Sequence, residues 1–259
     1  MKKGQITLFV ILGAVLLILI LLVFTFRETL MEQATKVGIP TTIAMSKEAK
    51  EVQNEMTRCL RNSAETGLIT MALQGGYVMF DPKTPYTEAT TTMYYIPYVG
   101  TAYLYYKGKN MVPTKETMER QLEGYITANL EICEKDYSGL EVEYGDYDTS
   151  VTIEENQVSI DINTKVSVTK EETTSSFRDI YIEVPVRLGG LRDITNQIVE
   201  EQVKTGKEGI CLSCISRIAA NNDVEISIDR VGEDVFYMLT DQKSKLAGEN
   251  YIFIMANQF

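Results

Sequence analysis

Four cysteines are the residues of this sequence best suited to chemistry, and the sequence contains no histidine. The absence of histidine excludes the Ser-His-Asp triad, the Cys-His pair and zinc sites that use imidazole. Four cysteines can form two disulfides in three ways. Cys211 and Cys214 form a CxxC pair, and Cys59 and Cys133 lie far from it. We favour disulfides joining Cys59 to Cys133 and Cys211 to Cys214, since such bridges persist in an exported domain.

The CxxC pair allows three interpretations: a local structural bridge, a redox-active pair or half of a zinc site. A helix expected over residues 210–220 would place Cys211 in its first turn, where the positive end of the helix dipole stabilises a thiolate. The sequence lacks the second CxxC of a tetrathiolate zinc site and the preceding βαβ pattern of a thioredoxin-like site. We therefore favour a structural bridge and predict no catalytic residue, no metal and no cofactor.

Two further motifs are incomplete. The segment from Asp146 has the oxygen spacing of a calcium loop, but Val151 and Gln157 stand where that loop needs Gly and Glu. Ser244 and Lys245 are adjacent without a surrounding signature of a Ser-Lys nucleophile. We interpret the first segment as an acidic turn and assign no role to the second.

The segment near the amino terminus from Ile6 to Phe26 contains no charged residue. Seventeen of the 21 residues from Ile6 to Phe26 are Ile, Leu, Val or Phe. Roughly 20 such residues, rising about 1.5 Å each, cross a hydrocarbon core of about 30 Å. The pattern predicts a short basic terminus and transmembrane anchor over residues 1–26 and a stalk over residues 27–44. The basic amino terminus favours the inside, so residues 45–259 are expected to be extracellular on a single-pass cell-membrane protein.

The segment Lys3-Gly4-Gln5-Ile6-Thr7 resembles the class III signal peptide of archaeal type IV pilin-like proteins. The resemblance covers the first 26 residues and implies cleavage by a prepilin peptidase between Gly4 and Gln5. Phe9 would be the fifth mature residue, where many pilins carry a Glu that registers neighbouring subunits. This departure bears on filament assembly more than on processing. The alternative interpretation is a permanent, uncleaved anchor.

The charge of the chain argues against nucleic acid as a partner. The whole sequence has 36 acidic and 25 basic side chains, and residues 1–26 contain two lysines and no acid, so 23 basic side chains remain outside them, a net charge of −13. Nucleic-acid binding normally requires a basic surface. The expected partners are the lipid bilayer, further copies of the chain and other envelope proteins.

Apolar spacing predicts an α+β fold, with helices packed on an antiparallel sheet. The extracellular domain is expected to span residues 45–259, with possible lobes at 45–136 and 137–259. Helices are predicted from Ser46 to Gly75-Gly76, after a cap at Thr114, and over residues 193–204 and 210–220. Strands are predicted at 77–80, 92–99, 102–107, 140–144, 150–153, 158–168, 177–186, 224–229, 235–239 and 251–255, with an edge or strand end at Pro185.

Tyrosines are concentrated in the first strands: eight of the 15 lie between residues 77 and 106. Tyrosine is enriched at interfaces because it combines an apolar ring with a polar tip. The alternative is that alternate tyrosines pack against the helices. The residues predicted to bind a partner are Tyr94, Tyr95, Tyr98, Tyr103, Tyr105 and Tyr106.

Together these patterns predict a membrane-anchored cell-surface protein with a pilin-like structural or adhesive role and without catalysis. One alternative is an exported thiol-disulfide oxidoreductase, with Cys211 as nucleophile and Cys214 as resolving thiol. Another is a ligand-binding envelope receptor or an assembly subunit of a larger complex.

Overall fold

The structure is a computed structural model that describes residues 45–79, 90–92, 100–206 and 209–258. These residues form an α+β fold with four α-helices and two largely antiparallel sheets, and the chain from Lys47 onward is one compact unit. Within those ranges, no helix combines the length and the apolarity that a membrane crossing requires. The predicted anchor and stalk, together with Gly4 and Gln5, lie outside the described residues.

Helix α2, Lys47–Leu73, is the long helix that the apolar spacing after Ser46 predicts. Side chains three and four residues apart share one face of a helix, and here that face is buried. Gly75 and Gly76 follow the helix with positive φ angles of 73° and 94°. The Gly76 N–H donates to the Met71 carbonyl at 2.8 Å, which satisfies a carbonyl that the helix end would otherwise leave open. The predicted glycine ending is therefore confirmed.

Helix α3, Lys115–Asn129, packs beside α2, and the predicted cap residue Thr114 accepts a hydrogen bond from its first turn. A short 3-10 helix, η1 (Glu131–Cys133), follows it. Side chains of α3 lie against α2 at Gly67, where an added Cβ would lie 2.8 Å from Leu122 Cδ1. A larger residue there would force the Leu122 and Tyr125 side chains to shift.

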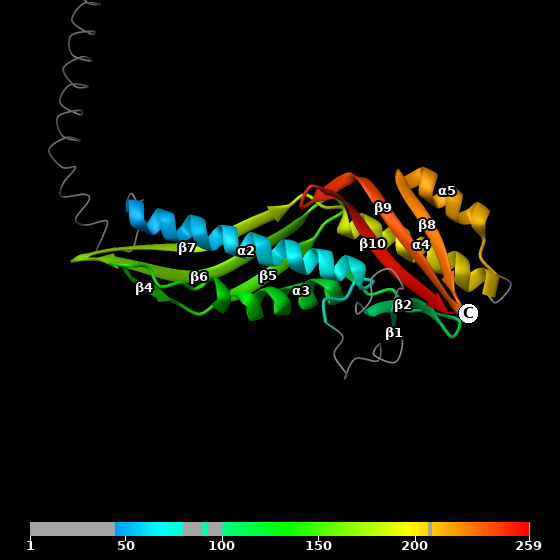
Figure 1. Cartoon of the computed structure of the whole chain (residues 1–259), viewed down its shortest axis with the longest axis horizontal. Helices are drawn as coiled ribbons and strands as arrows, with labels where there is room; N and C mark the ends of the chain where they lie inside the picture. Colours follow the sequence, from blue (N-terminus) through cyan, green and yellow to red (C-terminus); the bar gives the residue numbers. More distant parts are fainter. Residues whose placement is uncertain (1–44, 80–89, 93–99, 207–208, 259) are drawn as a thin grey trace, which may run out of the picture. The chain divides into compact units, whose positions relative to one another are not determined.

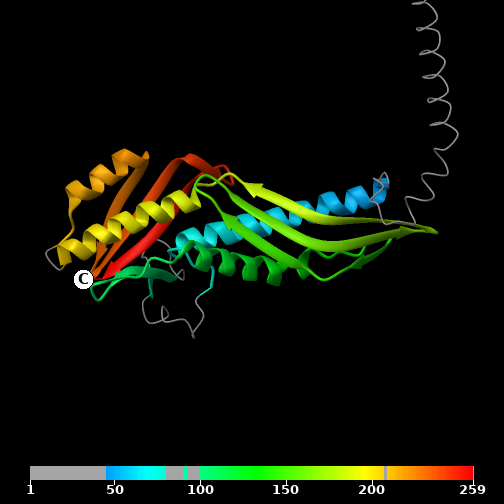
Figure 2. The ribbon, with the colours of Figure 1, turned by 180° about the vertical axis from the view of Figure 1, so that it is seen from behind.

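The first sheet lies against α2 and α3 (Figure 1). Its central strand β6 pairs with β7 along one edge and with β4 and β5, one after the other, along the other edge. Side chains of β6 alternate between buried and more exposed positions, so one face packs on the helices and the opposite face meets solvent. Figure 2 shows this sheet from the side opposite to that of Figure 1. The strands are β4 (Glu141–Tyr144), β5 (Asp148–Ile153), β6 (Val158–Lys170) and β7 (Thr173–Val184).

The outer edge of β5 is covered by two glutamates of α3. Glu123 accepts a hydrogen bond from the Val151 N–H at 3.1 Å, and Glu119 accepts one from the Ile153 N–H at 2.8 Å. Four helical residues rise about 6 Å and two strand residues about 7 Å, so the carboxylates match the spacing of the strand donors. These donors are therefore not open to pairing with another strand.

The second sheet has the strand order β1-β2-β10-β9-β8, with β3 paired to the end of β2. The β2–β10 pair is parallel, whereas an antiparallel sheet was expected throughout. The strands of this pair are far apart in the sequence, so no short turn forces them to run in opposite directions. The strands are β1 (Thr90–Thr92), β2 (Gly100–Tyr106), β3 (Lys109–Asn110), β8 (Val224–Val231), β9 (Asp234–Leu246) and β10 (Glu249–Gln258).

Three helices contact the second sheet. Helix α4, Leu188–Thr205, packs against β2 and β3, and helix α5, Leu212–Asn222, packs against α4 and β8. Helix α2 reaches β10, where the buried Tyr251 hydroxyl donates to the Leu68 carbonyl at 2.8 Å. Helix α2 therefore contacts both sheets.

Several predicted boundaries differ from the structure: β7 spans Thr173–Val184 instead of 177–186, and β9 spans Asp234–Leu246 instead of 235–239. Helix α4 begins at Leu188 instead of Asp193, because Gly189 fits inside its first turn, where any side chain would clash with the Glu154 carbonyl. Tyr77 and Val78 are buried but form no strand, since the Val78 N–H donates to the side chain of Gln121 in α3. The strand predicted at 92–99 meets β1 only at Thr92, and residues 93–99 lie outside the described residues.

Candidate functional site

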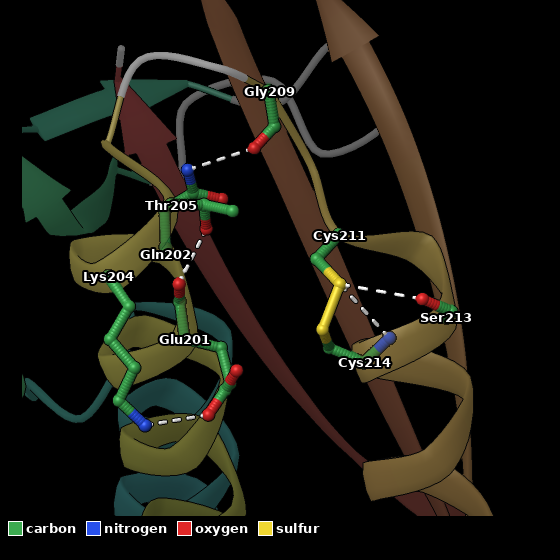
Figure 3. Close-up of a disulfide and its surroundings, with 8 residues drawn as sticks. All are labelled: Glu201, Gln202, Lys204, Thr205, Gly209, Cys211, Ser213 and Cys214. Atoms are coloured by element: carbon green, nitrogen blue, oxygen red, sulfur yellow. Dashed lines mark hydrogen bonds and ion pairs between the residues drawn. A yellow bond between two sulfur atoms is a disulfide. The ribbon is translucent and has the colours of Figure 1, made fainter.

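Cys211 and Cys214 form a disulfide at the start of α5 (Figure 3). Helix α5 begins at Leu212 and not at residue 210, so Cys211 is its N-cap residue instead of lying within its first turn as predicted. The Cys211 carbonyl accepts from the Ile215 N–H at 3.1 Å. The Cys214 N–H points at Cys211 Sγ from 3.3 Å, and Ser213 Oγ lies 3.5 Å from the same sulfur. One sulfur therefore faces two hydrogen-bonding groups of the first helical turn.

Both cysteines of this pair are partly exposed. The residue after Cys211 is Leu212, an apolar side chain that is 63 % exposed. Further along the helix, Ile215 and Ile218 are buried and fix α5 to the body of the domain. The disulfide thus lies at the accessible end of a helix whose opposite face is packed.

Gln202, in the last turns of α4, holds chain positions that precede Cys211. The Gln202 side-chain N–H groups donate to the Gly206 carbonyl at 3.0 Å and to the Gly209 carbonyl at 3.2 Å. Gly209 has a φ angle of 120°, which a residue with a side chain rarely adopts. Figure 3 shows Gln202 reaching Gly209 beside the disulfide. These bonds hold the ends of the α4–α5 connection in place.

A charged pair lies on the same turn of α4. Lys204 donates to Glu201 at 2.8 Å, and this hydrogen bond, with the lysine charge, holds the pKa of the Glu201 carboxyl below its usual value. Arg217 of α5 contributes a smaller lowering of the same pKa, so the charges of the two helices influence each other. The first turn of α5 contains no acidic residue, which leaves the positive end of its dipole uncompensated there.

The second disulfide joins Cys59 of α2 to Cys133 of η1. Cys133 is 2 % exposed, and the two cysteines are 74 positions apart in the sequence. Both disulfides are therefore paired as the sequence analysis favoured. The apolar spacing in the sequence indicates this pairing, because it places Cys59 and Cys133 on the apolar faces of the helices predicted after Ser46 and Thr114.

The tyrosines of β2 are mostly core residues. Tyr103 and Tyr105 are buried, and the Tyr103 hydroxyl donates to Asp234 at 2.6 Å. The prediction that these two rings form a partner-binding surface is wrong, because β2 lies between β10 and its other neighbours and has both faces covered. Tyr106 is partly exposed, stacks on Tyr103 with a centroid separation of 5.5 Å and has Lys107 over its ring. The other predicted binding residues lie outside the described residues: Tyr94, Tyr95 and Tyr98.

A buried ion pair that the sequence analysis missed anchors the far end of α5. Asp241 of β9 is fully buried and accepts from Arg187 at 2.9 Å and from the Ser244 hydroxyl at 2.5 Å. Arg187 also donates to the Asn222 carbonyl, the last residue of α5, at 3.3 Å. Ser244 is buried and neighbouring Lys245 is exposed, so they point to opposite sides of β9 and do not form a Ser-Lys pair. Arg187 and Asp241 are distant in sequence, so no local spacing reveals their pairing.

Across the part of the chain that the structure describes, no group of three or more Cys, Asp or Glu side chains is arranged to hold a metal ion. Comparison with protein-family models, with curated proteins and with solved structures finds no match to this chain. The functional argument therefore depends on the geometry of the domain and on the amino-terminal sequence.

Proposed function

We propose that this protein is a single-pass membrane protein whose domain lies outside the cell and has a pilin-like structural or adhesive role without catalysis. The observation that supports this most strongly is the pair of closed disulfides in a chain that also contains the uncharged segment from Ile6 to Phe26. Disulfides persist in oxidising compartments and are rare in a reducing cytosol. An anchor followed by a disulfide-bonded domain therefore fits export.

The described surface also fits a domain that binds through side chains. The β5 edge donors at Val151 and Ile153 are occupied by glutamates, so this edge does not offer a template for strand addition. Tyr106 and Lys107, next to the β2–β3 turn, remain accessible for contact. We propose that they form part of a surface for a second copy or another envelope protein, to which Tyr94, Tyr95 and Tyr98 would contribute.

Processing at the amino terminus is part of this proposal. The segment from Lys3 to Thr7 resembles a class III signal peptide, which implies a cut between Gly4 and Gln5. A mature protein that begins at Gln5 would keep the whole apolar segment. Amino-terminal sequencing of the membrane-bound protein separates this outcome from a permanent anchor, which would retain Lys2, Lys3 and Gly4.

Membrane retention can be tested by changing the charge of the anchor. Each Arg near the centre of a membrane helix costs about 3 kcal/mol, whereas the apolar segment as a whole favours insertion by several kcal/mol. The triple variant Leu12→Arg, Leu16→Arg, Ile20→Arg should therefore leave the membrane fraction. The isomeric control Leu12→Ile, Leu16→Ile, Ile20→Leu should remain there.

The orientation is tested in the same cells by adding protease outside intact cells. The proposal expects the domain of the unaltered protein to be digested while a cytosolic marker survives. Membrane retention of the triple arginine variant, or a domain digested only after lysis, would contradict the proposal.

A further inference from the structure

The Cys211–Cys214 disulfide combines features that suit exchange with other thiols. Both sulfurs belong to partly exposed residues, whereas the other bridge joins a partly exposed cysteine, Cys59, to a buried one, Cys133. Attack on a disulfide requires access of a thiolate to one of its sulfurs. Both cysteines of the CxxC bridge are open to attack, whereas the bridge between α2 and η1 offers one partly exposed cysteine, Cys59.

The reduced form of this pair would be stabilised by groups already in place. The Cys214 N–H lies 3.3 Å from Cys211 Sγ, at the amino terminus of an 11-residue helix without an acid in its first turn. A thiolate at Cys211 would accept that hydrogen bond and face the positive end of the dipole. A disulfide whose reduced form is stabilised is a better oxidant.

Opening this bridge should leave its surroundings folded. Helix α5 is fixed by the buried Ile215 and Ile218 and, at its last residue, by the bond from Arg187 to the Asn222 carbonyl. The α4–α5 connection is held separately by Gln202. The two sulfurs can therefore part and rejoin without loss of the helix that positions them.

We propose that the Cys211–Cys214 pair is a thiol-disulfide exchange site that oxidises protein dithiols outside the cell. The step is a stoichiometric exchange between two dithiols and not a catalytic cycle, and it goes beyond the structural or adhesive role. The exposed Leu212 between the cysteines favours a protein partner, because an apolar side chain next to the disulfide contacts apolar residues of a peptide.

The exchange is balanced between the two dithiols. A partner thiolate attacks Cys211 Sγ, a mixed disulfide forms and Cys214 Sγ leaves with the bonding electrons and takes up a proton. The partner's second thiolate then attacks the partner sulfur of the mixed disulfide, and Cys211 leaves as a thiolate held by the Cys214 N–H. The partner loses two electrons to form its disulfide, and the CxxC pair gains them as a dithiol.

The test uses the oxidised full chain in detergent and a synthetic peptide with two cysteines and apolar flanking residues. Alkylation and peptide mapping follow the four cysteines with time. The proposal expects Cys211 and Cys214 to open on the order of 10-fold faster than Cys59 and Cys133, with one peptide disulfide formed per opened pair. Equal opening of both bridges, or a closed CxxC pair under conditions that reduce the other bridge, would overturn it.

Three variants separate exchange from simple reduction. These two cysteine variants are given a one-cysteine peptide activated as a mixed disulfide with a small aromatic thiol. Cys214→Ser should capture the peptide at Cys211 and release that thiol, and Cys211→Ser should capture much less at Cys214. Leu212→Ser should slow the reaction with the peptide and leave the reaction with dithiothreitol unchanged. Equal trapping by the two cysteine variants would contradict the role of Cys211. An equal effect of Leu212→Ser on both reductants would contradict a protein partner.

Failure of these tests would leave the membrane assignment standing, because that assignment depends on fractionation. Conversely, loss of the membrane assignment would not alter the rates measured in detergent. The two proposals therefore fail separately.

Discussion

The two disulfides of this domain differ in the length of the loop that each closes and in their exposure. Cys59–Cys133 joins residues 74 positions apart on α2 and η1, and Cys133 is buried. Cys211–Cys214 spans three positions at the start of one helix and is partly exposed. The first bond constrains a large loop of the unfolded chain, whereas the second constrains almost none. We therefore expect loop length and burial, rather than the bond itself, to distinguish a structural bridge from an exchangeable one.

The largest expected effect comes from removing the long bridge. The double variant Cys59→Ser, Cys133→Ser frees a loop of about 75 residues, which costs about 4 kcal/mol of unfolding free energy by the chain-entropy model. For a domain of this size, that loss lowers Tm by roughly 8–16 °C. Thermal unfolding of the full chain followed by circular dichroism measures the shift. A change of Tm within error would contradict the structural role of this bond.

The packing next to the long bridge provides the next test. Gly67→Ala places a methyl group against Leu122 and Tyr125 and should destabilise the domain by about 1–3 kcal/mol. Gly124 is the matched control, because it lies on α3 with no atom near an added Cβ. Gly124→Ala should stabilise by about 0.5–1 kcal/mol through helix propensity. Denaturant unfolding measures the unfolding free energy of both variants. Equal changes in that free energy would contradict the close packing of α3 side chains against Gly67.

Removal of the short bridge should have a smaller effect on stability. Cys211→Ser with Cys214→Ser frees a loop of four residues, worth less than about 2 kcal/mol in the same model. Denaturant unfolding of both double variants under the same conditions gives the loss of unfolding free energy for each bridge, and the two losses can be compared directly. If the short bridge proved as stabilising as the long one, loop length would not explain their difference.

The smallest expected effect concerns the edge of β5. Glu119→Ala removes the acceptor for the Ile153 N–H at a partly buried position and should cost about 1 kcal/mol, because water replaces part of the bond. Arg120→Ala, an exposed change on the same helix, should stay within about 0.5 kcal/mol. Hydrogen exchange at Ile153 should accelerate in the first variant alone. Unchanged protection there would show that Glu119 does not cover the edge.

Local chemistry made most of the elements predictable. The cap at Thr114 and the glycines after α2 have conformational preferences that act over a few residues, and they mark helix ends in the structure. Alternation along β6 indicated a strand with one buried face. Pro185 follows the last residue of β7, as its lack of an N–H favours.

Contacts between distant segments could not be predicted in the same way. Gly189 resembles a loop residue, yet it lies inside α4 because the Glu154 carbonyl comes from a different part of the chain. The parallel β2–β10 pair and the Arg187–Asp241 ion pair also depend on packing between separated elements. At the candidate site, the cysteine pairing could be favoured from sequence, but the exposure of Leu212 required the fold.

The central claim, an exported membrane protein with two closed disulfides, is tested most directly by one mass measurement. The full chain is recovered from its native membrane with free thiols alkylated at lysis, and its intact mass is compared with that of a sample reduced before alkylation. The account predicts no alkyl group in the first sample and four in the second, one for each cysteine. Four alkyl groups without reduction would place the domain in a reducing compartment and contradict the account.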